Sequence, residues 1–195
     1  MSFIRTIPES EAAGEVKEIY DSEIETKGYL PNYAKLFCHR PKVMKAWRNL
    51  IRSIIENMDT RRYELVTLAA AAKLHSSYCM LAHGSVLKDK FYNSEQLNEI
   101  ITNSDSPLLS PIEKAMMKFA EKIVIDATSI NQDDIDVLRN LGLKDEEIFE
   151  IVTVTTARCF FSKTLDALGA EPDKLYLDLD EKLRNNLTVG RSISA

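Results

Sequence analysis

The stretch ELVTLAAAAKLHSSYCMLAH (residues 64–83) decides both the fold and the candidate chemistry of this chain. Residues 61–74 combine an acid, apolar residues and four consecutive alanines, which favours a buried helix that a neighbouring helix can approach closely. A second helix is expected to begin near residues 76–77. The thiol of Cys79 and the imidazole of His83 then lie four residues apart, on one face of that second helix.

Helical patterns continue on both sides of this stretch. Apolar residues recur at a spacing of three or four, between Gly, Pro and capping residues that start and stop helices. The expected helical segments are 8–28, a short helix within 29–41, 42–57, 94–103 capped by Ser94, one opening at Ser110–Pro111, one opening at 131–132, and 145–169. The prediction is an all-α fold of six to eight helices in one domain, residues 1–195, with a polar tail at 185–195 that is mobile or used in assembly.

The composition excludes several classes of protein. The chain has 195 residues, of which 45% are hydrophobic and 28% charged, as in soluble globular domains. Its 25 Lys and Arg against 30 Asp and Glu give a net charge of −5, and the basic residues form no stripe. We therefore expect no nucleic-acid binding. Because no apolar run approaches the roughly 20 residues of a membrane span, we also expect no membrane association.

The three cysteines, Cys38, Cys79 and Cys159, are too few and too scattered for a disulfide framework. The N-terminus lacks an apolar core of signal-peptide length. We therefore expect a cytoplasmic, reducing location, in which any cysteine chemistry uses a free thiol. Cys38 and Cys159 are expected to be ordinary core residues.

Cys79 and His83 form the candidate reactive pair. The thiolate is the reactive form of cysteine, and a cysteine in the first turn of a helix capped by Ser76 would be near unpaired backbone N–H groups that stabilise an anion. His83 is placed to take the thiol proton, directly or through one water. Glu64 would be costly to bury without a partner, and His83 is the partner we expect.

Ordinary readings of the same residues remain open at this point. A cysteine and a histidine four residues apart are more often part of a helical core than of a reactive site, and an acid such as Glu64 is most often solvated. The His, Cys, Asp and Glu residues show no zinc-site spacing, and the chain has no phosphate loop or dinucleotide-binding turn. We therefore expect neither a metal nor a cofactor.

Glu64, Ser76, Cys79 and His83 resemble the motif E-x11-C-x-x-C-x3-H of the alkylhydroperoxidase AhpD-like group, in the carboxymuconolactone decarboxylase superfamily. The flanking segments resemble its longer, peroxidase-related members. These segments are GYLPNYAKLFCHRPKVMKAW (28–47), LLSPIEKAMMKFAEKI (108–123) and DIDVLRNLGLKDEEIFEIV (134–152). The resemblance covers about residues 10–175, nearly the whole chain.

The resemblance implies an AhpD-like helical bundle that assembles as a homo-oligomer, a dimer, trimer or hexamer. It also implies reduction of hydroperoxides by a cysteine pair with a Glu/His proton relay. Carried over to this chain, Cys79 is the attacking cysteine, Glu64 and His83 form the relay, and Ser76 occupies the resolving position. Because a hydroxyl cannot form a disulfide, an external thiol reductant would have to reduce an oxidised Cys79.

Two alternatives stay open beside this peroxidase hypothesis. Decarboxylase members of the superfamily work without the cysteine pair, so Glu64 and His83 are candidates for acid–base catalysis on a lactone-type substrate. The second alternative is a non-catalytic scaffold of the same fold. A Cys79 that is fully buried, with no pocket reaching it, would favour the scaffold.

Overall fold

The structure, a computed structural model, describes residues 2–194 and contains only helices and connecting segments over that range. The α-helices are α1 (Gly14–Lys27), α2 (Asn32–Leu36), α3 (Pro41–Ile54), α4 (Thr60–Lys73), α5 (Ser77–Lys90), α6 (Ser94–Thr102), α7 (Pro111–Asp126), α8 (Gln132–Asn140), α9 (Asp145–Ala167) and α10 (Glu181–Leu187). Short 3-10 turns are η1 (Glu9–Glu11), η2 (Phe37–His39), η3 (Ala127–Ser129) and η4 (Lys174–Asp178). The prediction of an all-α fold is confirmed.

The number of helices was predicted too low. The described residues form ten α-helices, against the six to eight expected. The five-residue α2 lies within residues 29–41, where a short helix was expected. The helix with no expected counterpart is α10, whose segment Glu181–Leu187 has a mainly polar sequence with little helical periodicity.

Local sequence signals explain where the helices begin and end. Ser110 and Glu113 form the expected capping box at the start of α7, each side chain pairing with the other's backbone N–H. At α6 the cap is Asn93, paired with Gln96, and not Ser94, which is the first residue of the helix. Gly28 ends α1 with a φ of 79°, a left-handed conformation that glycine adopts without steric cost.

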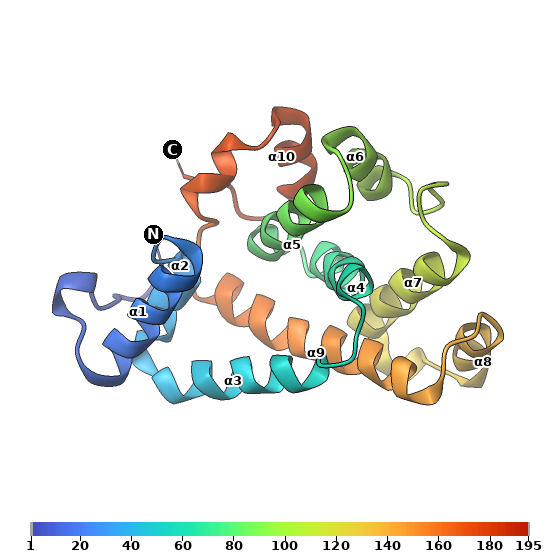
Figure 1. Cartoon of the computed structure of the whole chain (residues 1–195), viewed down its shortest axis with the longest axis horizontal. Coiled ribbons are helices and arrows are strands. Elements are labelled where there is room, and N and C mark those ends of the chain that lie inside the picture. Colours follow the sequence, from blue (N-terminus) through green and yellow to red (C-terminus); the bar gives the residue numbers. More distant parts are fainter. Residues whose placement is uncertain (1, 195) are drawn as a thin grey trace.

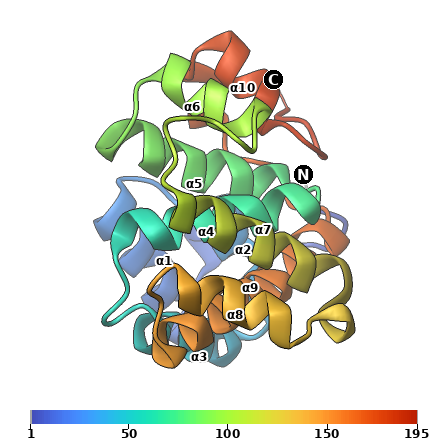
Figure 2. The same cartoon turned by 90° about the vertical axis from the view of Figure 1, so that its right-hand side faces the viewer.

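Helix α4 lies at the centre of the molecule, against α5, α7 and α9 (Figure 1). The turned view shows α6 and α10 on one side, then α5, then α4 with α7, and α9 with α3 and α8 on the far side (Figure 2). The alanines of α4 make this central position possible: Ala69, Ala70 and Ala71 are all buried. Their small side chains let neighbouring helices pack closely around α4.

The C-terminal segment, expected to be a polar tail, packs against α5. Leu187 is completely buried, and its side chain occupies the space in which a Cβ at Gly84 would lie. Beyond α10, the amide of Gly190 donates a hydrogen bond of 2.8 Å to the hydroxyl of Ser77. The tail therefore holds the outer face of α5, while α4 and α9 lie against its inner face.

Candidate active site

The turn between α4 and α5 sets the geometry of the site. His75 has a φ of 54°, in the left-handed region that non-glycine residues rarely adopt. The amide of Ser76 donates to the carbonyl oxygen of Ala71 at 3.0 Å. This reversal lays α5 alongside α4. As a consequence, the side chains of Glu64 and His83 meet although they are 19 residues apart in the sequence.

Glu64 and His83 form a largely buried acid–imidazole pair. Oε2 of Glu64 lies 2.5 Å from Nδ1 of His83, and the two side chains are 8% and 14% exposed. Burial lowers the pKa of His83, the nearby charge of Arg158 lowers it further, and the Glu64 carboxylate opposes both effects. The ring is therefore neutral at pH 7. Donation from Nδ1 to Glu64 leaves the lone pair of Nε2 as a proton acceptor.

The lowered pKa of His83 makes the stability of the fold depend on pH. Below the ordinary histidine pKa of about 6.5, the unfolded chain binds a proton that folded His83 does not, so the free energy of unfolding falls as the pH falls. The variant His83→Gln lacks this contribution. We expect the difference in unfolding free energy between wild type and His83→Gln, from urea titrations, to shrink between pH 7.5 and pH 5. A constant difference would contradict the lowered pKa.

The sulfur of Cys79 is enclosed and receives hydrogen bonds from α9. Cys79 is fully buried. The hydroxyl of Ser162 donates to Sγ at 3.1 Å, and Nη1 of Arg158 donates at 3.5 Å. Ser162 and Arg158 are one helical turn apart on α9, so one face of that helix presents both donors to the sulfur. The sulfur therefore accepts two hydrogen bonds, one of them from a charged donor.

Arg158 is a buried cation that touches no carboxylate in the described part of the chain. Its Nη2 donates to the hydroxyl of Tyr63 at 3.2 Å, and its Nη1 donates to Cys79. Burial opposes the charge of Arg158, but the neighbouring Cys79 and Tyr63 groups and the more distant Glu64 outweigh burial and raise its pKa. A buried guanidinium requires an anionic partner. The two ionisable groups in contact with the guanidinium are the Cys79 thiol and the Tyr63 phenol.

Tyr63 connects the cysteine side of the site with the histidine side. Its hydroxyl accepts from Arg158, and its ring stands edge-on to the ring of His83 with centroids 5.8 Å apart. Burial raises the pKa of Tyr63, while the charge of Arg158 opposes this rise. Cys79, Arg158, Tyr63, His83 and Glu64 therefore form one continuous chain of contacts across α5, α9 and α4.

Arg158, Ser162 and Tyr63 are candidate functional residues that the pattern around Cys79 does not reveal. Arg158 and Ser162 follow the cysteine by 79 and 83 residues, so no local spacing connects them. One signal was available in the sequence. An arginine within the apolar segment 145–169 is costly to bury unless it has a partner.

Ser76 does not cap α5 as expected. It occupies the N-cap position, but its hydroxyl accepts no hydrogen bond from the first turn. Ser76 is fully buried and lies close to Asp166 of α9. Burial raises the pKa of Asp166, and the Ser76 hydroxyl opposes this rise. Ser76 and Cys79 thus face successive turns of α9, which carry Asp166 and Ser162.

The other two cysteines lie in different surroundings. Cys38 is buried, as expected, and its sulfur accepts from the amide of Ile7 at 3.4 Å. Cys159 is only partly buried, so the expectation that it belongs to the core is wrong in part. Burial raises the pKa of Cys159, which disfavours its thiolate. The hydrogen bonds to Cys79 come from Ser162 and Arg158, and neither of the other cysteines takes part in them.

The complete burial of Cys79 is the observation that favours the scaffold alternative. Among the residues that form the chain of contacts around the sulfur, His83 is the most exposed, at 14% of its side chain. A reactant therefore reaches Sγ only when the residues that cover it move. Small reactants require the smallest movement, so the site favours reactions of small molecules.

Within residues 2–194, no group of three or more His, Cys, Asp and Glu side chains is placed to hold a metal ion. Over the same residues, no helix combines the length and the apolar character needed to cross a bilayer.

The central segment of the chain matches one family model. Residues 41–122 match the model of the carboxymuconolactone decarboxylase family, a span that contains Glu64, Ser76, Cys79 and His83. The resemblance inferred from the sequence is thereby confirmed. A comparison with curated proteins finds no significant match.

Three solved structures share the fold over nearly their whole length. A peroxidase-related protein from Ralstonia eutropha JMP134, described as an alkylhydroperoxidase AhpD core, is 20% identical with a TM-score of 0.80, covering 90% of this chain and 94% of that one. A peroxidase-related protein from Silicibacter sp. TM1040 is 19% identical with a TM-score of 0.76, covering 90% and 91%. A cysteine-to-alanine variant of the debrominase Bmp8, in complex with 2,3,4-tribromopyrrole, is 14% identical with a TM-score of 0.73, covering 96% and 98%. At these identities the likeness shows an AhpD-like fold.

Proposed function

We propose that this chain, whose residues 41–122 match the carboxymuconolactone decarboxylase family on an AhpD-like fold, is a thiol-dependent peroxidase that reduces small hydroperoxides through Cys79. The observation that carries the proposal is the buried guanidinium of Arg158, which donates to the Cys79 sulfur. Arg158 and Ser162 together stabilise a thiolate, and the thiolate is the form of cysteine that attacks a peroxide.

The neutral imidazole of His83 provides the proton transfer. His83 takes the proton of the Cys79 thiol, directly or through one water, and the Glu64 carboxylate stabilises the imidazolium that forms. The sulfur then attacks one peroxide oxygen, and the O–O bond breaks as two electrons pass from sulfur to oxygen. Cys79 becomes a sulfenic acid. The departing alkoxide or hydroxide takes the proton from His83 and leaves as an alcohol or as water.

Ser76 determines how the cycle is completed. With a hydroxyl at the resolving position, the sulfenic acid of Cys79 reacts with an external thiol to give a mixed disulfide and water. A second molecule of the thiol displaces Cys79, which regains its proton, and leaves as the oxidised disulfide. Such a cycle requires a reducing, thiol-rich compartment, and the cytoplasm is the one we propose.

The burial of Cys79 favours small peroxides. Because its side chain is fully covered, hydrogen peroxide and short alkyl hydroperoxides reach the sulfur more readily than bulky lipid hydroperoxides do. The partly exposed His83 marks the side from which the peroxide approaches.

Two substitutions separate the peroxidase from its alternatives. Cys79→Ser is expected to abolish the consumption of hydrogen peroxide with a thiol reductant, while His83→Gln lowers the rate by about a hundredfold, the usual contribution of a proton-transfer residue. Cys159→Ser is the matched control and is expected to keep the wild-type rate. A lyase would instead lose turnover of a lactone acid in His83→Gln and keep it in Cys79→Ser. A scaffold would consume no peroxide in any of these proteins.

An organobromine is the second candidate substrate class, because a fold neighbour is a debrominase whose cysteine variant holds a tribromopyrrole. Attack of the Cys79 thiolate on bromine would give a sulfenyl bromide and a carbanion that takes a proton. An external thiol then displaces bromide from the sulfur to give a mixed disulfide, and a second molecule of the thiol restores Cys79. Release of bromide from 2,3,4-tribromopyrrole, measured beside peroxide consumption, distinguishes the two substrates.

A further inference from the structure

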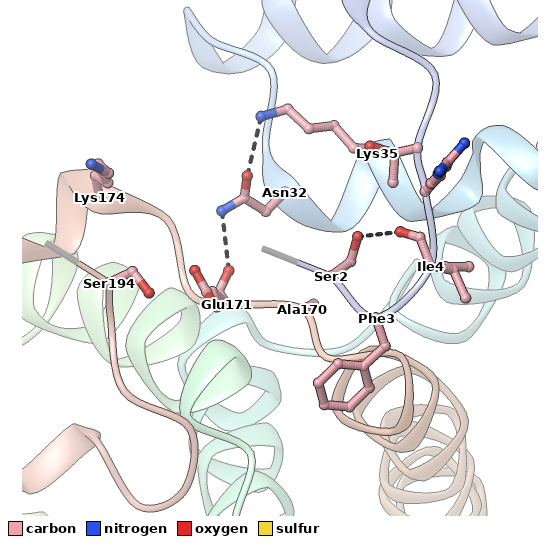
Figure 3. Close-up of a pocket in the computed structure, with 11 residues that line it drawn as sticks. Ser2, Phe3, Ile4, Asn32, Lys35, Ala170, Glu171, Lys174 and Ser194 are labelled. Atoms are coloured by element: carbon pink, nitrogen blue, oxygen red, sulfur yellow. Dashed lines mark hydrogen bonds between the residues drawn. The ribbon is translucent and has the colours of Figure 1, made fainter.

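A hollow of about 670 Å³ lies where the N-terminal residues meet α2 and the segment that follows α9. Figure 3 shows this hollow and the side chains that line it. Its polar lining comprises Ser2, Arg5, Thr6, Asn32, Lys35, Lys174 and Ser194, with Glu171 as an acid of the lining. The size suits a molecule of a few amino-acid residues.

Positive charge gathers at this hollow although the whole chain carries a net charge of −5. Arg5 comes from the N-terminal segment, Lys35 from α2 and Lys174 from η4. None of the three forms an ion pair with an acid among the residues that the structure describes. Three cations from separate segments that converge on one concave surface favour an anionic ligand.

Asn32 fixes the polar side of the hollow. Its side-chain oxygen accepts from Nζ of Lys35 at 3.1 Å, and its side-chain nitrogen donates to the carbonyl oxygen of Glu171 at 3.1 Å, as Figure 3 shows. The backbone amide of Asn32 donates to Oδ1 of Asp173 at 2.8 Å. These bonds position Lys35 before a ligand binds, so less side-chain freedom is lost on binding.

Asp173 connects the lining of the hollow with the residue next to Cys79. Asp173 is buried and also accepts from the hydroxyl of Tyr78, the residue next to Cys79 in the sequence. Burial raises the pKa of Tyr176, two residues beyond Lys174, and Asp173 and Cys79 raise it further. The segment 170–176 therefore borders the hollow and, through Asp173, contacts Tyr78, the sequence neighbour of the reactive cysteine.

We propose that this hollow binds the external reductant of Cys79, and that the reductant is a small anionic thiol with one or more carboxylates. The inference rests on the proposed function. Lys35, Lys174 and Arg5 hold the carboxylates, and the thiol approaches Cys79 past the segment 170–176. The thiol RS–H reacts with the sulfenic acid to give Cys79–S–S–R and water, and a second RS–H gives R–S–S–R and restores the Cys79 thiol.

A binding experiment tests the hollow independently of the reactivity of Cys79. The probe is S-methylglutathione, an anionic thioether that cannot react, titrated into the full chain by calorimetry. We expect saturable binding to wild type and its loss in the double variant Lys35→Gln/Lys174→Gln. The matched control, Lys90→Gln/Lys182→Gln, removes the same charge from other exposed positions and should bind like wild type. No saturable binding to wild type, or equal binding to both double variants, overturns the inference.

A kinetic experiment tests the role as reductant site. Cys79 is oxidised with a pulse of peroxide, and the return of the thiol is followed with glutathione or with neutral 2-mercaptoethanol. We expect Lys35→Gln/Lys174→Gln to slow the reaction with glutathione and to leave the reaction with 2-mercaptoethanol unchanged. Equal rates in wild type and variant with both thiols contradict the inference. If no sulfenic acid forms at all, the proposed function fails, and the binding experiment still decides whether the hollow takes the anion.

Discussion

Replacing Arg158 with methionine is expected to slow the reaction of Cys79 with hydrogen peroxide at pH 7 by about ten- to hundredfold. A cation in contact with an acid increases the fraction of that acid in its charged form by about this factor, and the thiolate is the charged form that reacts. Arg158 is the cation that donates to the sulfur, and methionine fills a similar space without charge. The rate of sulfenic acid formation, measured from pH 6 to pH 10, checks this expectation. The difference in rate between Arg158→Met and wild type should disappear at high pH, where the thiolate forms without the guanidinium.

The pH profile separates an electrostatic role of Arg158 from a structural one. Arg158→Lys keeps the charge and should retain an intermediate rate. The unfolding free energy of Arg158→Met is expected to stay near that of wild type, since removing a buried charge together with its desolvation cost is often neutral. A rate for Arg158→Met equal to that of wild type at pH 7 would show that the guanidinium does not activate Cys79.

Ser76→Cys is expected to convert the chain from reduction by an external thiol to an internal disulfide cycle. Ser76 and Cys79 lie three residues apart at the start of α5, both fully buried and both facing α9. After oxidation of Cys79, the introduced thiol should resolve the sulfenic acid about a hundredfold faster than millimolar external thiol, because it acts at a high effective concentration. Non-reducing mass spectrometry after a peroxide pulse detects the loss of two hydrogens in place of the gain of one oxygen.

Ser77→Cys is the matched control for this experiment. Ser77 is the adjacent serine, but its hydroxyl accepts from the amide of Gly190 on the outer face of α5, away from α9. We expect no disulfide with Cys79 in that variant. Equal disulfide formation in Ser76→Cys and Ser77→Cys would contradict the orientation of α5, and none in either would contradict peroxide attack by Cys79.

Local sequence patterns were enough to predict the part of the site that lies on α4 and α5. A small-residue helix, a turn and a second helix are consecutive in the sequence, and the predicted partner of Glu64 was His83. The 2.5 Å contact between them is present. The prediction rested on the cost of burying Glu64 without a partner, and the contact forms because α5 folds back against α4. The catalytic roles of these residues remain predictions.

The part of the site on α9 was beyond prediction because it depends on packing between distant segments. Arg158 and Ser162 reach Cys79 only because α9 crosses both α4 and α5. The position of Ser76 shows the same limit. Its residue type predicted a helix cap, whereas the buried hydroxyl accepts no hydrogen bond from the first-turn amides. Tertiary contacts decided both outcomes.

The most direct test of the account is the site of oxidation after a brief pulse of hydrogen peroxide on the whole 195-residue chain, read by peptide mass spectrometry with a trap for sulfenic acid. Cys79 should gain one oxygen, and it should do so faster than Cys38 and Cys159, which serve as internal controls in the same sample. If Cys79 stays unmodified, or is oxidised no faster than Cys38 and Cys159, Cys79 is not a peroxide-reactive thiol and the proposed function is wrong.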